Sequence, residues 1–244
     1  MNKKYTYVWV SLIVLIFGII VIPRIVDRLS SGSVVENDRL NSEGKNSDDE
    51  ELAYILLDGK RRKVPSFEFI NQDSVLVSDK DYLGKVYVVD FFFTRCPSIC
   101  PVMTTNLVGV QEHFKNADDF ALASFSITPD VDTPQVLRAY KEKYGVTGEN
   151  WNFMTGDQEG IYELANAGFN IFAAEMPDVP GGFEHSGLFA LVDKEGYLRS
   201  RIDEYGNPIV YYRGAILEEK GVNDHGETEE IGILKVDIQK LLEE

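Results

Sequence analysis

Cysteine is scarce in this chain, since only Cys96 and Cys100 occur among its 244 residues. Two cysteines cannot build a scaffold of several disulfides, and they are too few for a zinc site made of four cysteines. Any redox or metal chemistry based on thiolates must therefore come from this one pair. Histidine is nearly as scarce, with three residues in the chain, so few imidazoles are available to join the cysteines at a metal.

Basic residues are also few. The chain has 24 Lys and Arg against 40 Asp and Glu, which gives a formal net charge of −16 at pH 7. A protein of this charge repels phosphate, which argues against sequence-independent binding of nucleic acid. Hydrophobic residues make up 44% of the chain, which is enough for a packed core. The length suits one globular domain with an additional segment.

The N-terminal part has one long run without charge. Tyr5–Ile22 comprises 18 uncharged, mostly apolar residues, just enough for a helix to cross a bilayer core about 30 Å thick. No small-residue cleavage site follows, so we expect residues 1–28 to be an uncleaved transmembrane anchor. Lys3 and Lys4 favour a cytoplasmic N-terminus. We therefore expect a single-pass protein of the cell (inner) membrane, with its domain on the periplasmic, extracytoplasmic side.

The rest of the chain divides into a linker and a domain. Residues 29–53 are polar, lack aromatic side chains and end in an acidic cluster, a composition typical of a flexible tether. Residues 54–244 have the patterning of a globular domain.

The order of elements in this domain predicts its fold class. Strands are expected at 85–93, 120–128 and about 151–154, with a hairpin formed by 186–192 and 197–202. Helices are expected at about 101–114, 134–144, 158–167 and 229–242. This order predicts an α/β sandwich with both parallel and antiparallel strands.

The two cysteines lie in the segment FTRCPSICP (93–101), directly after a buried strand and at the start of a helix. A helix N-terminus stabilises negative charge, so we expect at least one thiol to ionise more easily than an ordinary cysteine. The i, i+4 spacing can bring both sulfurs to one side of the turn, where they could share a metal or form a disulfide. A structural disulfide across so short a loop would restrict the unfolded chain little. A redox or metal role is therefore favoured over a structural bridge or inert thiols.

Three stretches of the sequence together resemble the Sco/SenC family. They are DYLGKVYVVDFFFTRCPSICP (81–101), SITPDVDTP (126–134) and FEHSGLFALVD (183–193), and the resemblance extends from about Val64 through the last helix. Members of this family are membrane-anchored, thioredoxin-fold copper proteins involved in cytochrome c oxidase assembly. The resemblance implies a thioredoxin-like fold with a mixed central sheet flanked by helices. It also implies copper held by Cys96, Cys100 and His185.

The donor chemistry of these three residues fits copper independently. Paired thiolates are soft ligands that favour Cu(I), and an imidazole helps a site to accept Cu(II) as well. Zinc could use the same three groups with water as a fourth ligand. Without the family, His185 would better fit a core histidine. We expect His113, on the helix after the cysteines, and His225, in an acidic stretch, to be ordinary surface residues.

Other residues near these motifs have competing interpretations. Met103 could add a thioether ligand, but packing in the core is favoured. Asp130 and Asp132 could accept a hydrogen bond from His185 and so orient it, whereas Asp132 is more economically explained as a helix cap. The family commonly has an aspartate where this chain has Thr128, a departure that does not affect the three ligands.

Three functional hypotheses follow. The first is a copper metallochaperone that serves a cytochrome c oxidase subunit, or another copper or thiol protein at the membrane. The second is a thiol–disulfide oxidoreductase that uses only Cys96 and Cys100, and the third is a redox sensor. Thioredoxin-like reductases usually have two residues between the cysteines and a proline before the later strand. Here three residues intervene and Glu184-His185-Ser186 precedes that strand, which favours metal binding. We expect the acidic segment 218–230 to be solvated.

Overall fold

The computed structural model describes residue 15 and residues 41–43, 51–57, 59–178, 181–202 and 208–244. Within this part of the chain, no helix is long and apolar enough to cross a membrane. The predicted anchor Tyr5–Ile22 lies outside the described residues except for Leu15. The chain divides into two units, 1–39 and 40–244, and the second carries all the elements discussed below.

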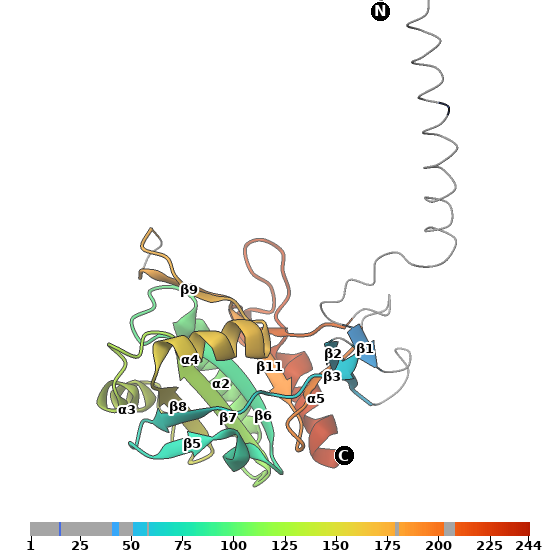
Figure 1. The fold of residues 1–244 in the computed structure, drawn as a ribbon, viewed down its shortest axis with the longest axis horizontal. Helices are drawn as coiled ribbons and strands as arrows, with labels where there is room; N and C mark the ends of the chain where they lie inside the picture. The colour runs from blue at the N-terminus through green and yellow to red at the C-terminus, as the bar shows by residue number, and fades with distance from the viewer. Residues whose placement is uncertain (1–14, 16–40, 44–50, 58, 179–180, 203–207) are drawn as a thin grey trace, which may run out of the picture. The chain divides into compact units, whose positions relative to one another are not determined.

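A mixed β-sheet forms the centre of the domain (Figure 1). In spatial order its strands are β1 (Asn41–Glu43), β2 (Ala53–Leu57), β12 (Leu198–Ser200), β11 (Leu188–Val192), β6 (Val86–Phe92), β7 (Phe120–Ser126), β8 (Trp151–Thr155), β4 (Glu68–Asn71) and β5 (Leu76–Ser78). β6, β7 and β8 run parallel, while β11 and β4 pair antiparallel with their neighbours β6 and β8. Two short strands extend the sheet, β3 (Lys60–Arg61) beside β2 and β13 (Tyr212–Arg213) beside β11. The predicted combination of parallel and antiparallel strands is confirmed.

The two central strands follow directly from their sequences. Every residue of β6 (VYVVDFF) and of β7 (FALASFS) is buried. Parallel strands covered on both faces need apolar side chains at successive positions, so they show runs of apolar residues instead of alternation. The loop that carries the first cysteine therefore follows a fully buried strand in the middle of the sheet.

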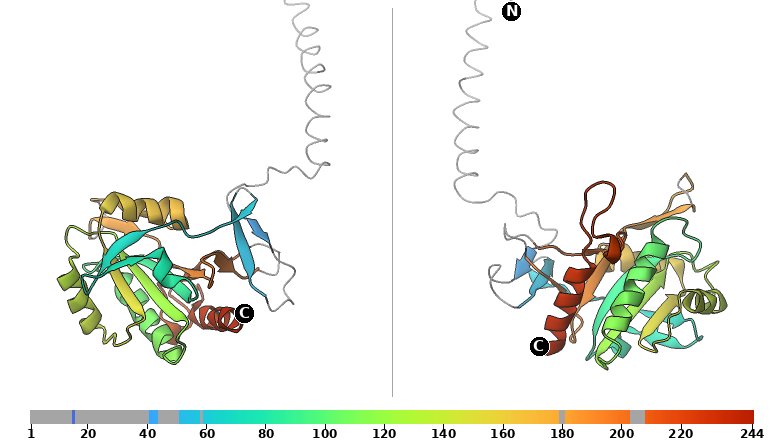
Figure 2. Two further views of the ribbon diagram at one scale, coloured as in Figure 1. Left: turned by 60° about the horizontal axis from the view of Figure 1, so that its bottom comes forward. Right: turned by 180° about the vertical axis from the view of Figure 1, so that it is seen from behind.

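Helices cover both faces of the sheet. α2 (Cys100–His113) and α5 (Ile231–Glu243) lie side by side on one face, and α4 (Gln158–Glu163) crosses the other (Figures 1 and 2). α3 (Pro134–Lys143) packs against β8 and β4. The predicted helix 158–167 is α-helical only as far as Glu163, and the chain continues as a π-helical segment, η2 (Leu164–Phe169). Two single 3₁₀ turns, η1 (Asp79–Tyr82) and η3 (Glu218–Lys220), complete the helices of the described residues.

Two elements differ from the sequence-based expectations. β1 pairs antiparallel with β2, although Asn41–Glu43 falls within residues 29–53, where we expected only a flexible linker; ordered structure therefore begins before residue 54. The second difference is a separate two-stranded sheet made by β9 (Ala173–Glu175) and β10 (Phe183–His185). It was not predicted because its strands are only three residues long and one consists of AAE.

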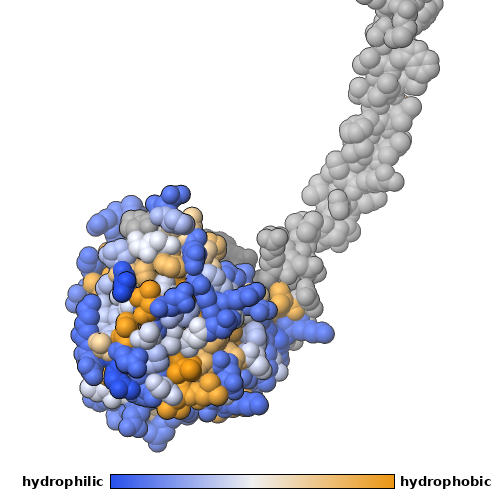
Figure 3. Space-filling view, turned by 60° about the vertical axis from the view of Figure 1, so that its left-hand side comes forward, coloured by the Kyte–Doolittle hydropathy of each residue, from blue (hydrophilic) through white to orange (hydrophobic). Residues whose placement is uncertain are grey.

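The surface of the face seen in Figure 3 is mainly hydrophilic, with separate hydrophobic areas. The exposed large apolar side chains of the domain include Ile70, Val75 and Leu76 on the β4–β5 hairpin at the sheet edge. Ile70 and Leu76 are paired in register, so these side chains form one small apolar area at the sheet edge. The larger apolar side chains are mostly buried between the sheet and its helices.

Candidate metal centre

The two cysteines lie where the central strand β6 gives way to helix α2. The loop between these elements, residues 93–99, is here called the cysteine loop. Its first turn is closed by the Cys96 N–H, which donates to the Phe93 carbonyl at 3.2 Å. α2 then begins at Cys100, with Pro101 in its first turn, where a missing N–H costs no helical hydrogen bond. The predicted placement at a helix N-terminus after a buried strand is confirmed.

The sulfur atoms of the pair are close together. The backbone N–H of Cys100 donates to Cys96 Sγ at 3.5 Å, and the two thiols also hydrogen-bond to each other. Cys96 Sγ lies 3.7 Å from the hydroxyl oxygen of Ser98. Both residues are thiols in this structure. The i, i+4 spacing therefore brings both sulfurs to one side of the turn, as predicted.

Burial controls the protonation of Cys100. It raises the pKa of the Cys100 thiol far above its ordinary value, and the hydrogen bond with Cys96 raises it further; a hydrogen bond with the Phe93 backbone acts in the opposite direction. We expected the helix N-terminus to ease ionisation of at least one thiol; Cys100 is not that thiol, because desolvation outweighs the helix dipole there. Such a thiol stays neutral at physiological pH unless a bound cation displaces its proton.

The backbone of His185 lies in β10, paired in register with Ala173 of β9. Its side chain lies outside the described part of the structure. The residues on either side of it contact the cysteine loop. The Phe183 ring centroid is 5.7 Å from that of Phe93, and a Cβ placed on Gly187 would lie 3.4 Å from Ile99 Cδ1. The chain segment that carries His185 therefore runs along the cysteine loop.

The strand opposite His185 is anchored to the π-helical segment. Asn166 of η2 donates from Nδ2 to the Ala173 carbonyl at 2.9 Å and accepts the Ala173 N–H at 3.2 Å. The Ser186 N–H donates to the Phe172 carbonyl at 3.0 Å, which extends the pairing past His185. Sequence analysis missed this anchor because one asparagine in a helical segment carries no distinguishing pattern.

A buried arginine holds the end of η2. Arg62 donates to the carbonyl oxygens of Ala167 and Gly168 at 2.6–3.0 Å. These carbonyls lie at the C-terminal end of a helix, where acceptors lack partners within the helix. Desolvation lowers the pKa of the Arg62 guanidinium. Arg62 therefore fixes the segment that leads into β9.

The remaining candidate ligands are accounted for as follows. Met103 is fully buried, which confirms the expected core packing. His113 and His225 are exposed, on α2 and in the 221–229 loop, as expected. Asp130 is exposed as well. Among the side chains that the structure describes, no three His, Cys, Asp or Glu residues form a metal-binding group, and the His185 side chain is not among those described.

The interpretation of Asp132 as a helix cap is wrong. Thr133 caps α3, since its side chain accepts the Val136 N–H. The fully buried carboxylate of Asp132 instead accepts hydrogen bonds from Thr94, Ser126 and Thr128. The sequence signal was ambiguous because Asp and Thr are both common N-cap residues and stand next to each other here.

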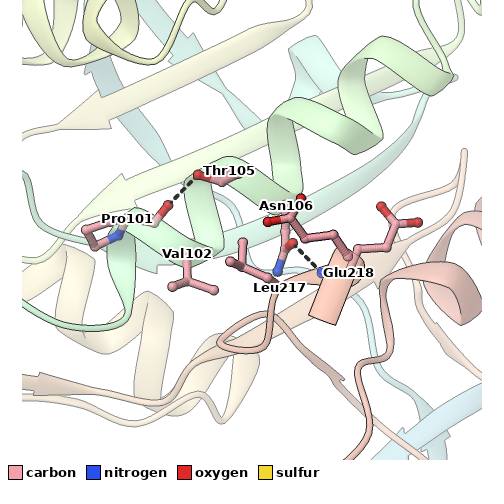
Figure 4. A pocket seen from close by; sticks show the side chains of 7 residues that line it. Pro101, Val102, Thr105, Asn106, Leu217 and Glu218 are labelled. Carbon is pink, nitrogen blue, oxygen red and sulfur yellow. Dashed lines mark hydrogen bonds between the residues drawn. The ribbon is translucent and has the colours of Figure 1, made fainter. Parts of the chain in front are cut away.

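A groove of about 330 Å³ opens between the first turns of α2 and the segment around η3 (Figure 4). Pro101 and Val102 line one side, and Leu217 and Glu218 line the other. Asn106 joins the two sides: it donates to the carbonyls of Gly214 and Ile216 at 2.9 and 2.7 Å and accepts the Glu218 N–H at 3.1 Å. These hydrogen bonds hold the 214–218 segment against α2.

Comparison with known proteins gives consistent matches to one family. Residues 57–214 match the model of the SCO1/SenC family. The SCO1 protein homolog of Bacillus subtilis is 35% identical over 136 residues, which cover 55% of this chain and 70% of that protein.

Two solved structures extend the comparison to the fold. BsSco, a member of the Sco family of cytochrome c oxidase assembly proteins in which a disulfide switch was identified, has a TM-score of 0.59 and 28% identity. That match covers 74% of this chain and 94% of BsSco. The ScoI of Bradyrhizobium japonicum, solved with copper bound, has a TM-score of 0.51 and 24% identity over 59% of this chain and 92% of its own. The expected thioredoxin-like α/β fold is thereby confirmed.

Proposed function

The chain belongs to the SCO1/SenC family, and on that premise we propose that its domain is a copper metallochaperone for cytochrome c oxidase assembly. The cargo is copper, as Cu(I) or Cu(II), and its ligands are Cys96, Cys100 and His185. The domain either delivers the ion to a cytochrome c oxidase subunit or prepares that subunit's copper site.

The chemistry of the two thiols supports copper as the cargo. Soft thiolates select soft ions such as Cu(I). A cation that binds here must displace the proton from Cys100, whose thiol burial keeps neutral. A soft ion gains most from that exchange, because its bonds to sulfur are strong while the site offers little to a hard cation.

The observation that carries the assignment of His185 is the packing of its neighbours. Phe183, two residues before it, packs against Phe93, and Gly187, two residues after it, lies beside Ile99. Alternate residues of a strand lie on one face, and position 185 stands between positions 183 and 187, so these contacts support His185 as the third ligand. With three protein ligands, the ion remains accessible to a thiolate or thioether from the receiving protein.

A second function, thiol–disulfide exchange, is favoured by the hydrogen bond between the thiols. In that reaction Cys96 and Cys100 would give up two electrons and two protons to a partner's disulfide. They would become a disulfide, and the partner's sulfurs would become two thiols. This reaction needs no histidine, so His185 separates it from copper transfer.

We also propose that the domain works at the membrane, on the extracytoplasmic side. The support is the uncharged run Tyr5–Ile22 with Lys3 and Lys4 before it. Protease added to intact spheroplasts should degrade the domain, whereas protection until the cells are lysed would contradict this orientation.

Copper titration of the reduced full-length chain tests the ligand set. We expect the wild-type chain to bind one copper ion with thiolate-to-copper charge-transfer absorption. His185→Ala should weaken binding by about 100-fold or more, because even the loss of a residue that only orients a ligand costs about 10–100-fold. The Cys96–Cys100 disulfide should still form in this variant.

The exposed histidines provide matched controls. His113→Ala and His225→Ala remove an imidazole from the surface and should leave stoichiometry, affinity and absorption unchanged. If His185→Ala behaved like these two controls, His185 would not be a ligand. If copper were not bound and the reduced chain turned over disulfide substrates, the second function would replace the first.

A further inference from the structure

A single carboxylate connects the cysteine loop to the neighbouring strand. Asp132 is fully buried. Its Oδ1 accepts the Thr94 hydroxyl at 2.5 Å. Its Oδ2 accepts the Thr94 N–H at 3.0 Å and the hydroxyls of Ser126 at 2.6 Å and Thr128 at 3.0 Å. All four donors are neutral, so they stabilise the charge by hydrogen bonding rather than by an ion pair.

This arrangement is not needed to start helix α3. The N-cap of α3 is Thr133, and the turn before it is closed by the N–H groups of Val131 and Asp132, which donate to the Thr128 carbonyl at 3.0 and 2.9 Å. The carboxylate of Asp132 is therefore available to bond elsewhere. It bonds across 38 residues of sequence to Thr94, as well as to its local partners Ser126 and Thr128.

One backbone turn connects Thr94, which Asp132 holds, to the sulfur of Cys96. Thr94 stands two residues before Cys96 and follows Phe93, whose carbonyl accepts the Cys96 N–H at 3.2 Å. Cys96 Sγ in turn accepts the N–H of Cys100. Because both the backbone and the side chain of Thr94 are held, the turn that presents Cys96 has little freedom to shift.

We propose that Asp132 is a positioning residue for Cys96, which holds the cysteine loop on the end of β7 in the geometry that receives copper. This role rests on the proposed copper function, but Asp132 itself does not touch the ion. Its carboxylate acts through Thr94, which it holds by two hydrogen bonds.

Thr128 is the third residue that donates a hydroxyl hydrogen bond to Asp132. Its hydroxyl donates to Asp132, whereas an aspartate at the same position would bring a second negative charge into a buried site. Thr128 therefore adds a donor to the Asp132 carboxylate, where an aspartate would add further acceptors.

Isosteric substitution of Thr94 in the full-length chain tests the proposal. Thr94→Val keeps the shape and the backbone N–H but removes the hydroxyl donor. Thr94→Ser keeps both donors and serves as the conservative rescue. Thr104→Val is the matched control, because Thr104 lies one helical turn after Cys100 and its hydroxyl bonds to Tyr140 at 2.7 Å instead of to Asp132. Asp132→Asn, which removes the charge, completes the set.

Two measurements are made on each variant. The first is Cu(I) affinity in competition with a Cu(I) chelator, together with the thiolate-to-Cu(II) absorption band. The second is the rate at which iodoacetamide modifies Cys96 in the metal-free, reduced chain, located by mass spectrometry. We expect Thr94→Val and Asp132→Asn to weaken Cu(I) binding by about 10–100-fold, to shift the absorption band and to speed the modification of Cys96. Thr94→Ser and Thr104→Val should match the wild type.

The outcomes decide the proposal as follows. If a folded Thr94→Val chain kept wild-type affinity, absorption and Cys96 reactivity, Asp132 would not position Cys96. An equal loss in Thr104→Val would make the effect general destabilisation and would also overturn the proposal. If Asp132→Asn fails to fold, Thr94→Val and Thr94→Ser decide. If the wild-type chain binds no copper, the proposed function fails, while the reactivity of Cys96 still tests the positioning role.

Discussion

The two cysteine residues differ in how far solvent reaches them. Cys96 keeps 8% of its surface exposed and Cys100 keeps 1%. Burial also raises the pKa of the Cys100 thiol, so its reactive thiolate form is rare near neutral pH. Cys96 is thus the sulfur that a partner reaches first, and Cys100 is the inner member of the pair.

The order of chemical modification follows from this difference. In the reduced, metal-free chain at neutral pH, iodoacetamide should label Cys96 before Cys100, because the thiolate is the reactive form and Cys100 is both buried and protonated. Labelling of Cys100 should rise only at alkaline pH, since burial stabilises its neutral form. Mass spectrometry of the digested chain, sampled over time and pH, measures both rates. Faster labelling of Cys100 than of Cys96 at pH 7 would contradict this account of the pair.

Residue-level prediction from sequence succeeded where spacing carried the signal. The pair at 96 and 100, followed by a proline, predicted thiols at a helix mouth, which the structure confirms. The role of Asp132 and the protonation of Cys100 could not be predicted in this way. Both depend on which groups pack around a buried atom, and that is decided by contacts across many residues of sequence.

The elements that carry His185 form a connected unit. η2 is capped at its C-terminal end by Asn170, which has a positive φ of 54°, and the chain then enters β9, which pairs with β10. Arg62 donates to the Ala167 carbonyl of η2, and Asn166 donates to the carbonyl of Ala173, the residue paired with His185. π-helical segments are rare and are frequently found at functional sites. Here the segment places an asparagine where it can pair with the base of the hairpin.

Removal of the Asn166 side chain should loosen this unit. Asn166→Ala deletes three hydrogen bonds, to the Tyr162 carbonyl and to both backbone groups of Ala173. We expect a loss of about 1–3 kcal/mol in the free energy of unfolding, measured by urea denaturation. We also expect faster hydrogen exchange at residues 173–186.

Asn223→Ala is the matched control for Asn166→Ala. Asn223 also makes three hydrogen bonds, within the 221–229 loop. Its substitution should leave both copper affinity and exchange in the β9–β10 hairpin unchanged. Unchanged exchange in the hairpin of Asn166→Ala itself would show that Asn166 does not anchor β9.

A buried charge network around Arg199 connects three parts of the domain that are far apart in the sequence. Arg199 of β12 is 3% exposed. It donates to the Leu52 carbonyl at 2.6 Å, to Asp193 at 3.2 Å and to Glu244 at 2.8 Å. It thereby joins the start of β2, the β11–β12 turn and the end of α5. Burial raises the pKa of Asp193, while Arg199 acts against that shift.

A double-mutant cycle measures the coupling free energy between Arg199 and Asp193. Arg199→Met leaves the buried Asp193 carboxylate without its cation and should cost about 3–5 kcal/mol of unfolding free energy. Asp193→Asn in the same chain should recover part of that loss, because it removes the uncompensated charge. Urea denaturation of the four proteins gives the coupling free energy. Additive losses would show that the two charges do not depend on each other.

At the scale of the whole molecule, the strongly apolar segments were predictable and the short ones were not. β6 and β7 are buried along their length, and α3 begins at Pro134 after its threonine cap, so each has a local signal. β9, β10 and β1 have three residues each, and each pairs with a strand that is its neighbour in the sequence. Three residues are too few to show the alternation that marks a strand, which is why the base of the His185 hairpin had to come from the structure.

The central claim is that one imidazole joins two sulfurs around a copper ion. X-ray absorption spectroscopy of the Cu(I)-loaded full-length chain tests it most directly. The account predicts sulfur scattering from Cys96 and Cys100 together with nitrogen and outer-ring scattering from a single imidazole, and it predicts that His185→Ala loses the imidazole signal. A spectrum that shows sulfur alone, identical in the wild type and in His185→Ala, would contradict it.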